Sequence, residues 1–383
     1  MRALALVVLV CGCSQNNAQN NIKPDPLPGT APVLQEGIWT DLTPTNLGIP
    51  WGTSNGFTQG MAIDPKTPAT LYLAVCGFDI TAAGLFKSSD AGTSWRRVAK
   101  VTTNADHLDE PIRVRVDPRN PQHLYVGDGV RGASGGFWVS WDGGETFTQP
   151  PAFVALEKQE GMFPFDVYDV APDPSDFNHV LVAHHAAWGW TDTKWNTSSG
   201  ILESKDGGDS WIVHPPRDGW GSGHAINFLY NPELGIGDSS SWLLGTQGAG
   251  MWRTTDAGNN WTKVSELGIQ HGGGSVYYAH SGTLFSSGAN QNLKSTDNGQ
   301  SWTAVGPSKG FNAIAGDGTR LYALQGFGPA SFITSSETDG TTWTAFSTQE
   351  FKDGSFEIQL DKANRILYSA TWGSGIWAMK VAP

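Results

Sequence analysis

The sequence predicts an all-β protein, a single seven-bladed β-propeller of four-stranded antiparallel blades. Three observations lead to this fold. A short phrase recurs six times along the 383 residues. Strands of alternating apolar and polar residues recur with it, at a spacing of about 40 residues. The seventh unit lacks its last strand, and a matching strand stands near the start of the chain.

The recurring phrase has the pattern Ser/Thr-x-Asp-x-Gly-x-x-Trp, with Phe replacing Trp once. Its copies are residues 88–95, 140–147, 204–211, 254–261, 295–302 and a less regular 336–343. We expect the Asp carboxylate to accept hydrogen bonds from N–H groups of its own turn. The Gly permits positive φ where the chain reverses, and the Trp can bury its ring against the hairpin. Six copies in a row indicate a repeat architecture.

Further strands surround each copy of the phrase. In the first unit they are residues 60–64, 70–75, 84–88 and 95–99. The next three units repeat this order, and the last three units begin with strands at residues 275–279, 312–316 and 357–361. Period-2 alternation bounded by Pro, Gly and Asp is the strand signal. Four strands in each unit predict the blade of a propeller.

The seventh unit has no copy of the phrase and ends one strand short. Its last strand is residues 375–381 (GIWAMKV), and residues 37–42 (GIWTDL) resemble the strand that follows each phrase. We therefore expect the N-terminal strand to pair into the last blade and close the ring. Closure removes an unpaired strand edge, which promotes aggregation. An open solenoid would instead carry polar caps at both ends, and the sequence shows none.

The first residues have the pattern of an export signal. Arg2 precedes an apolar run, residues 3–10, that is too short to span a bilayer. The following Cys-Gly-Cys resembles a bacterial lipobox in which Cys13 carries the lipid, and an ordinary secretory signal is the alternative. We expect a signal peptide at residues 1–12, a lipid-anchored disordered tether at 13–36 and the propeller at 37–383. The protein is then an exported bacterial cell-envelope lipoprotein or cell-surface protein, or otherwise secreted.

Composition limits the possible partners. The formal net charge is −12 and basic runs are absent from the sequence, which argues against nucleic acid. Beyond the export signal Cys76 is the only cysteine, so no intramolecular disulfide is available. We expect no cofactor, a monomer, and membrane contact only through the lipid anchor.

On these repeats, residues 38–383 resemble the Asp-box, or BNR-repeat, β-propeller superfamily. Sialidases, xyloglucanases, polysaccharide lyases, sortilin-type receptors and photosystem II assembly factors share its fold. The resemblance implies that the phrases, here called boxes, lie between the two outer strands of each blade and away from the ligand face. It specifies fold rather than function, and it singles out no member family.

Topology separates the scaffold from the candidate site. Because strands alternate in direction, loops between second and third strands share one face with the links between blades. We call this the upper face and the opposite one the box face. The longest upper loops are expected at residues 43–59, 102–111, 150–165, 184–199 and 215–223. Long loops on a rigid ring often carry function.

Aromatic side chains concentrate in these loops. Residues 184–195 (HHAAWGWTDTKW) hold two His and three Trp. Flat aromatic faces suit sugar rings, although each indole could instead pack loop against loop. The residues expected to bind substrate are Trp51, Trp188, Trp190, Trp195, Trp220, Arg217 and His271.

The candidate catalytic residues of the upper face are His185, His184, His107, His224, Tyr168 and Arg131. Adjacent residues of a strand point to opposite sides. His184 and His185 therefore cannot both face one ligand and make a poor metal pair, and no other spacing indicates a metal site. His and Tyr suit proton transfer, and Arg suits neutralisation of a sugar carboxylate.

Three enzyme classes can be compared with this set of candidate residues. Sialidases need an arginine triad whose first Arg precedes the first box, and no Arg lies between Arg2 and Arg96. A xyloglucanase-like hydrolase needs two opposed carboxylates. Acidic residues are available, but that family places its cleft between two propellers and this chain predicts one. A lyase acting on uronates fits the His, Tyr and Arg inventory best, by analogy with lyases of the same fold.

We therefore expect a secreted or surface-tethered carbohydrate-active propeller that cleaves an extracellular polysaccharide. A uronate-type lyase is favoured and a glycoside hydrolase comes next. The alternative is a non-catalytic propeller that binds a glycan or a protein. A deep upper pocket with convergent His, Arg and Tyr would favour catalysis, and a shallow aromatic platform would favour binding.

Overall fold

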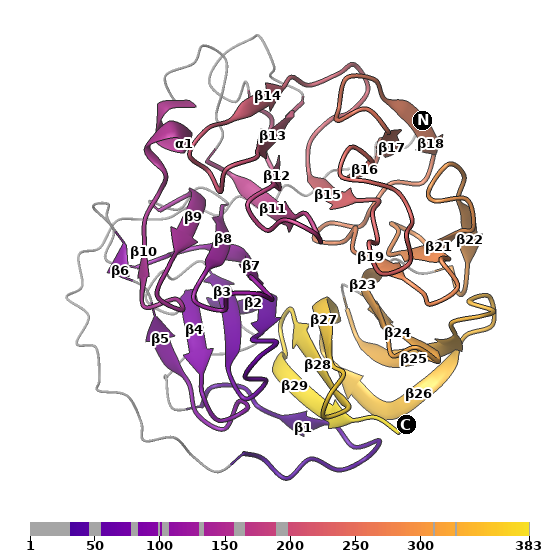
Figure 1. The fold of residues 1–383 in the computed structure, drawn as a ribbon. Helices are drawn as coiled ribbons and strands as arrows, with labels where there is room; N and C mark the ends of the chain where they lie inside the picture. The colour runs from indigo at the N-terminus through magenta and orange to yellow at the C-terminus, as the bar shows by residue number, and fades with distance from the viewer. Residues whose placement is uncertain are drawn as a thin grey trace, which may run out of the picture.

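The chain forms a ring of seven blades (Figure 1). Residues from the first strands of blades two to seven line a cavity at its centre, which we call the channel. The computed structural model describes residues 31–45, 55–77, 83–98, 100–101, 107–129, 134–156, 165–188, 198–308, 311–325 and 328–382. Within these ranges the only helix is α1 (Pro151–Leu156). The prediction of an all-β seven-bladed propeller is confirmed.

In each blade the first strand lies nearest the channel and the later strands follow outward (Figure 1). Blade one is β2 (Asn55–Ile63), β3 (Leu71–Gly77), β4 (Gly84–Ser88) and β5 (Arg96–Val98). Blade three is β11 (Val167–Pro172), β12 (Val180–His184), β13 (Ile201–Ser204) and β14 (Ile212–His214). Blade four is β15 (His224–Phe228), β16 (Trp242–Thr246), β17 (Gly250–Thr254) and β18 (Thr262–Ser265).

The same order continues around the ring. Blade five is β19 (Val276–Tyr278), β20 (Leu284–Ser286), β21 (Asn292–Ser295) and β22 (Thr303–Val305). Blade six is β23 (Phe311–Gly316), β24 (Arg320–Gln325), β25 (Ala330–Ser336) and β26 (Thr344–Phe351).

Blade two is the least regular. Its sheet contains β7 (Pro111–Val116), β8 (Leu124–Asp128) and β9 (Gly136–Ser140). In place of a full fourth strand, Thr148 forms a single antiparallel bridge with Val139. The adjacent β10 (Thr146–Phe147) pairs in parallel with β6 (Lys100–Val101), which follows blade one. The outer edge of blade two is therefore shared with its neighbour.

The N-terminal strand closes the ring, as the sequence predicts. Blade seven is β27 (Ser355–Asp361), β28 (Ile366–Thr371), β29 (Gly375–Lys380) and the outer β1 (Thr40–Asp41). In the antiparallel register of β1 and β29, Thr40 lies opposite Ala378. Glu36 adds a bridge to Lys380, one residue before the predicted start of the propeller. The last blade thus combines strands from near both ends of the sequence, β1 and β29.

The boxes form one hydrogen-bonded turn repeated around the ring. In box three, Ser210 donates to Asp206 from its backbone N–H at 2.8 Å and from its hydroxyl at 2.5 Å. The Ser204 hydroxyl donates to Asp206 and accepts from the Gly208 N–H at 2.8 Å. These hydrogen bonds hold the pKa of Asp206 below its usual value, against the opposing effect of burial. The predicted role of the Asp is confirmed.

Two consecutive residues with positive φ make each regular box turn. The residue before the box Gly has φ of 55° at Ala91 and 52° at both Ala257 and Asn298. Gly occupies the same place in boxes two and three, as Gly143 and Gly207. Because L-residues other than Gly seldom adopt this conformation, the hydrogen bonds of the box hold alanine in a strained backbone.

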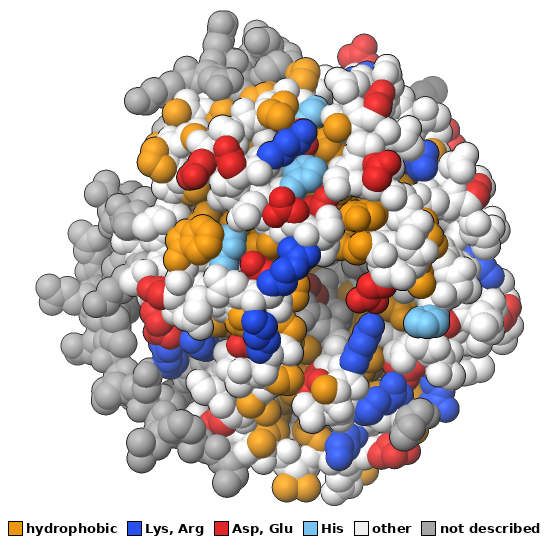
Figure 2. Space-filling view, viewed as in Figure 1, with side chains coloured by type: hydrophobic (Ala, Val, Ile, Leu, Met, Phe, Trp, Pro, Cys, Tyr) orange, Lys and Arg blue, Asp and Glu red, His pale blue; other side chains and the backbone are white. Residues whose placement is uncertain are grey.

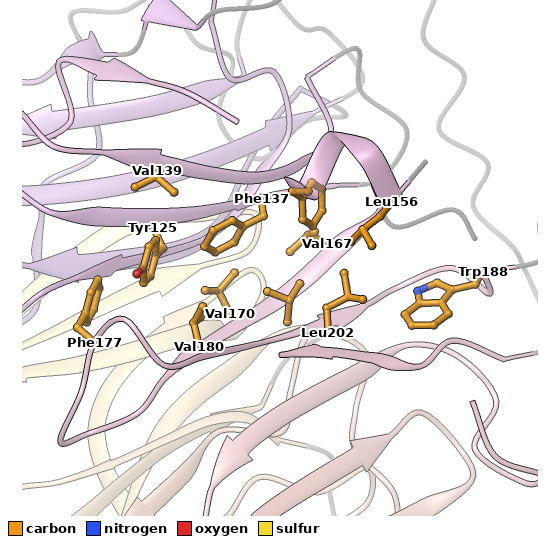
Figure 3. Close-up of a cluster of buried hydrophobic side chains, with 12 residues drawn as sticks. Tyr125, Phe137, Val139, Leu156, Val167, Val170, Phe177, Val180, Trp188 and Leu202 are labelled. Carbon is orange, nitrogen blue, oxygen red and sulfur yellow. The ribbon is translucent and has the colours of Figure 1, made fainter. Parts of the chain in front are cut away.

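Blades are held to each other by interlocking apolar faces. Between blades two and three, Tyr125 and Phe137 on one side meet Val170, Val180 and others on the other side (Figure 3). Figure 2 shows a face of the ring on which acidic and basic side chains are interspersed and the centre is hollowed. The hydrophobic core is therefore divided into layers, each of which lies between two neighbouring blades, and the centre of the ring is polar.

Candidate functional site

Blade three brings acidic and imidazole groups to the upper face. β11 and β12 are antiparallel, and Val167 lies opposite His184. Asp166, just before β11, therefore meets His185, just after β12. The two residues are joined by a backbone hydrogen bond of 3.0 Å, and the His185 Nδ1 lies 3.2 Å from the Asp166 Oδ2. Asp166 is buried, whereas a fifth of the His185 side chain is exposed.

Three rings form a triangle at this place, which we call the ring triangle: His185, Tyr168 and His271. The ring centres are 5.1 Å apart for Tyr168 and His185, 5.4 Å for Tyr168 and His271, and 5.2 Å for the two histidines. His271 comes from the link between blades four and five, and its Nδ1 lies 3.2 Å from the Gln247 Oε1. Three residues predicted from sequence thus meet, although they span 104 positions of the chain (168 to 271).

Burial keeps two groups of the ring triangle, His271 and Tyr168, uncharged at neutral pH. It lowers the pKa of His271 to about 4, and the nearby His185 acts in the same direction. His271 is therefore neutral at neutral pH. Tyr168 is almost fully buried, and burial raises the pKa of its hydroxyl. Tyr168 is thus a neutral phenol in contact with two partly buried imidazoles.

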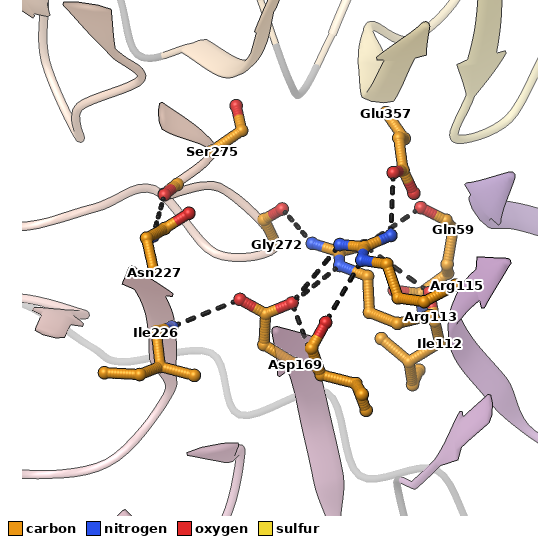
Figure 4. A network of polar contacts seen from close by, with 12 residues as sticks. Gln59, Ile112, Arg113, Arg115, Asp169, Ile226, Asn227, Gly272, Ser275 and Glu357 are labelled. Atoms are coloured by element: carbon orange, nitrogen blue, oxygen red, sulfur yellow. Dashed lines mark hydrogen bonds and ion pairs between the residues drawn. The ribbon is translucent and has the colours of Figure 1, made fainter. Parts of the chain in front are cut away.

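A network of ion pairs lines the channel (Figure 4) and includes Asp169 and Gly272, the sequence neighbours of Tyr168 and His271. Arg113 donates to the Gln59 and Gly272 carbonyls at 3.1 and 3.0 Å and pairs with Asp169 at 3.5 Å. Arg115 pairs with Asp169 at 3.5 Å and with Glu357 at 2.9 Å. The network links blades one, two, three and seven and the link that carries His271. It borders a cavity of about 330 Å³.

A row of stacked aromatic rings continues the upper face into blades one and seven. Trp372 stacks on Phe57 at 4.3 Å and on Phe356 at 4.6 Å. Gly272, with φ of 76°, packs so tightly on Phe356 that a Cβ there would lie 2.0 Å from the Phe356 ring. The aromatic row therefore touches the backbone beside His271. Loop length does not predict this row, because Trp372, its central ring, lies in the short loop between β28 and β29.

The acidic residues of blade two are buried rather than offered to solvent. Asp109, Glu110 and Asp128 are each at most 3% exposed. The Ser134 hydroxyl bonds both Asp109 and Asp128. Burial, with the charge of Asp109, raises the pKa of Asp128 well above its usual value. These carboxyl groups hold the upper end of the blade together and present no pair to a solvent-borne substrate in this structure.

Several predicted site residues lie away from the ring triangle. His184 is fully buried with its ring edge against Trp188, 5.3 Å between centres, on the opposite side of the strand from His185. Trp188 and Trp220 are fully buried, the latter with its edge against Trp261. Their burial leaves no indole face for a sugar, so we leave both out of the proposal below.

The remaining predicted residues fall into two groups. Arg217 donates to the Asn259 carbonyl at 2.6 Å, at the turn of box four, and His107 is buried just before blade two. The structure describes the backbone of His224, at the start of β15, and not its side chain. Outside the described residues lie Arg131, Trp51, Trp190, Trp195 and Cys13.

In the described part of the chain, no three His, Cys, Asp or Glu residues are grouped so that they could hold a metal ion. None of the helical segments described reaches the length and apolar character needed to cross a bilayer.

The architecture places this chain in the class of seven-bladed β-propellers. Residues 236–356 match a family model described as the DUF6242 beta propeller domain. A xyloglucanase from Hypocrea jecorina is 26% identical over 308 residues, which cover 70% of this chain and 34% of that protein. A xyloglucanase from a Paenibacillus species is 23% identical over 285 residues, 66% of this chain and 27% of that protein. The chain thus spans about a third or less of these curated relatives.

Solved structures resemble the ring at low sequence identity. An extracellular domain of a putative hybrid two-component system from B. thetaiotaomicron has a TM-score of 0.58 at 13% identity, covering 85% of this chain and 40% of that one. YCF48 bound to D1 peptide has a TM-score of 0.56 at 15%, covering 92% and 99%. An ancestral GH74 enzyme has a TM-score of 0.54 at 18%, covering 91% and 45%. These likenesses show the fold alone.

Proposed function

We propose that this protein is an exported, carbohydrate-active propeller that binds an extracellular polysaccharide on its upper face and cleaves it by elimination at a uronate. The observation that carries the proposal is the meeting of His185, Asp166 and His271 on the upper face. Two xyloglucanases among the relatives support a polysaccharide as the substrate class. The sequence of residues 1–13 supports export, with Cys13 as the lipidated residue.

His185 is suited to act as the base. An ionised Asp166 can only accept a hydrogen bond, so the Nδ1 of His185 carries the hydrogen and the Nε2 is left to take a proton. Asp166 also compensates the positive charge that His185 gains. In the eliminative reaction the base removes the proton at C5 beside the sugar carboxylate. The C4–O bond breaks, a C4=C5 double bond forms, and the leaving oxygen takes a proton from solvent water, while His185 returns the C5 proton to solvent.

The other groups of the site act around this step. His271 is neutral at neutral pH and partly buried. It can relay a proton without net change of charge by taking one at one ring nitrogen and releasing one from the other. Tyr168 contacts both imidazoles and positions them rather than touching the polymer. Arg131 remains the residue that we predict to neutralise the sugar carboxylate. The guanidinium of Arg113 is already engaged, because it contacts Gln59, Gly272 and Asp169.

Hydrolysis is the second candidate, and the names of the curated relatives favour it. A hydrolase needs one carboxylic acid and one carboxylate on either side of the scissile bond. Among the described residues, Asp109, Asp128 and Asp166 are at most 3% exposed. The carboxylates of Asp169 and Glu357, in the network beside the ring triangle, are held in ion pairs with arginines. Elimination by histidine therefore fits the exposed groups better.

The test is the mass of the products. The protein is incubated with acidic and neutral polysaccharides, and the products of wild type, His185→Ala and the control His280→Ala are weighed. His280 is an exposed histidine of the β19–β20 turn. We expect unsaturated products without added water from wild type and the control, and none from His185→Ala. One water added per cut would establish hydrolysis instead. Binding without any product would leave a non-catalytic module.

A further inference from the structure

Box two, on the box face, carries an exposed aromatic side chain that is not required for its turn. Trp141 is the second residue of box two, and 61% of its surface is exposed. The same position holds exposed polar residues in the other four regular boxes: Ser89, Lys205, Thr255 and Thr296. The box turn therefore forms without an aromatic residue here. Single exposed apolar side chains are common on protein surfaces, so a ligand site at Trp141 has to be argued from the fixed orientation of the indole and from the groove beside it.

The indole of Trp141 is held in one orientation. It stacks face to face on His123, with ring centres 3.7 Å apart and planes at 11°. His123 in turn meets the edges of Tyr125 and Phe177 at 4.7 and 5.0 Å, which belong to the core between blades two and three. Burial lowers the pKa of His123 to about 4, so the supporting ring is neutral at neutral pH. A rigid platform loses little conformational freedom when a ligand binds.

Trp141 forms one wall of a groove between blades two and three, which we call the box groove. Its volume is about 590 Å³, within the range of about 300–1,000 Å³ that is usual for ligand sites. Pro150 and Pro151 add apolar surface, and the polar lining comes from Asp176, Asn178 and Asp209 among others. One flat aromatic face with several hydrogen-bonding groups around it characterises the site.

We propose that the box groove is a second carbohydrate-binding site, which takes a short segment of neutral sugar residues. The C–H face of a pyranose can stack on the indole while its hydroxyl groups donate to the carboxylates. The lining carries three acidic residues, Asp176, Asp206 and Asp209, against Lys205. This excess of negative charge disfavours uronates and other anions.

A protein partner fits the box groove less well. Stable protein interfaces bury about 800 Å² on each side around a cluster of apolar anchors. In this groove the only large exposed aromatic among its described lining residues is Trp141. A single sugar-sized platform with polar neighbours matches a glycan.

The box groove is separate from the ring triangle. Trp141 follows the box end of β9, whereas His185 follows the upper end of β12. The five residues of a strand such as β12 span about 16 Å. Binding in the groove therefore does not depend on the reaction proposed for the upper face, and the inference stands whether or not that proposal holds.

The test measures binding in the full chain by titration calorimetry. The probes are cellohexaose and xyloglucan, which are neutral, and polygalacturonate, which is acidic. All variants also carry His185→Ala, so that cleavage cannot alter the probe. Trp141→Thr introduces the residue of boxes four and five, and Asp209→Asn introduces the residue that box four has as Asn259. Both are thus tolerated by the box turn elsewhere in the chain.

We expect the neutral probes to bind, with at least tenfold weaker binding in Trp141→Thr and weaker binding in Asp209→Asn. Melting temperature is recorded for each variant. If Trp141→Thr fails to fold, Trp141→Phe must retain part of the affinity and Asp209→Asn must lose part of it. The proposal is overturned if no neutral probe binds, if binding is unchanged in both variants, or if polygalacturonate is the ligand that depends on Trp141.

Discussion

The box face and the upper face of the ring follow opposite rules. On the box face, five turns repeat one set of hydrogen bonds within eight residues of sequence. On the upper face, His185, His271 and Trp372 come from different blades and share no repeat. The repeated turns stabilise the fold together, so the fold can survive the loss of one of them. A unique cluster has no second copy, so its loss removes the site.

The largest expected effect is a loss of activity from a single substitution on the upper face, compared with a loss of stability from one on the box face. His185→Ala should lower activity by about 10²–10⁴-fold, as expected for loss of a general base, with little change in stability. Asp206→Ala in box three should keep activity and lower the free energy of unfolding by about 1–2 kcal/mol, because it leaves the Ser210 N–H without its acceptor. Steady-state kinetics and urea unfolding measure both. Equal loss of activity in the two variants would contradict the division of roles.

This division also explains what the sequence could predict. The boxes, the four-stranded blades and the closing strand depend on local patterns and on counting repeats, and the sequence predicted them correctly except in blade two, where a single bridge from Thr148 replaces the fourth strand. His185, Tyr168 and His271 were named because topology assigns loops to faces. Their triangle could not be predicted, since it depends on how far each loop reaches toward the channel.

Burial was the other unpredictable quantity. Trp188 and Trp220 have the loop position expected of sugar-binding residues, yet packing against His184 and Trp261 encloses them. Trp141 shows the converse, because its box position indicated scaffold and the structure exposes its indole. Residue type and loop position alone do not distinguish a buried aromatic from an exposed one.

The second prediction tests how tightly the upper face is packed. Gly272→Ala places a Cβ 2.0 Å from Phe356 and forces alanine to φ of 76°. We expect a loss of about 4 kcal/mol, from overpacking and from the left-handed backbone together. Gly248→Ala is the matched control, with φ of 82° and no atom within 4 Å of the new Cβ. It should cost about 1 kcal/mol. Similar losses in both variants would mean that Phe356 moves aside freely.

The third prediction concerns pH and the box side of blade three. His179 lies between Asp173 at 3.2 Å and Glu203 at 2.9 Å. Although burial opposes it, these two carboxylates raise the pKa of His179 to about 9. Burial also opposes the shift at Glu203, where hydrogen bonds from His179 and His214 lower the pKa to about 2. A raised histidine pKa stabilises the fold below about pH 6.5, and this contribution is lost as pH rises to 9. A lowered Glu pKa stabilises above about pH 4.5 and is lost as pH falls toward 2.

Urea unfolding across pH 5–10 measures this contribution. The difference in unfolding free energy between wild type and His179→Gln should be greatest near pH 5–6 and shrink by up to about 3 kcal/mol by pH 10. His280→Gln, at an exposed turn, is the control and should follow the wild-type profile. A constant difference at all pH values would show that His179 acts by packing and not by charge.

The smallest effect probes the strain stored in the boxes themselves. Ala257 has φ of 52° in box four, where boxes two and three have Gly143 and Gly207. Left-handed backbone costs an alanine about 1–2 kcal/mol, while glycine increases the entropy of the unfolded chain by about 0.4–1 kcal/mol. Ala257→Gly should therefore stabilise the protein by about 0.5 kcal/mol, and Gly207→Ala should destabilise it by a similar amount. The urea midpoint at unchanged slope reports both. If Ala257→Gly stabilises the protein and Gly207→Ala destabilises it, the box turn has the same conformation wherever it occurs. If both variants lower the free energy of unfolding, each box has instead adapted to its own residue.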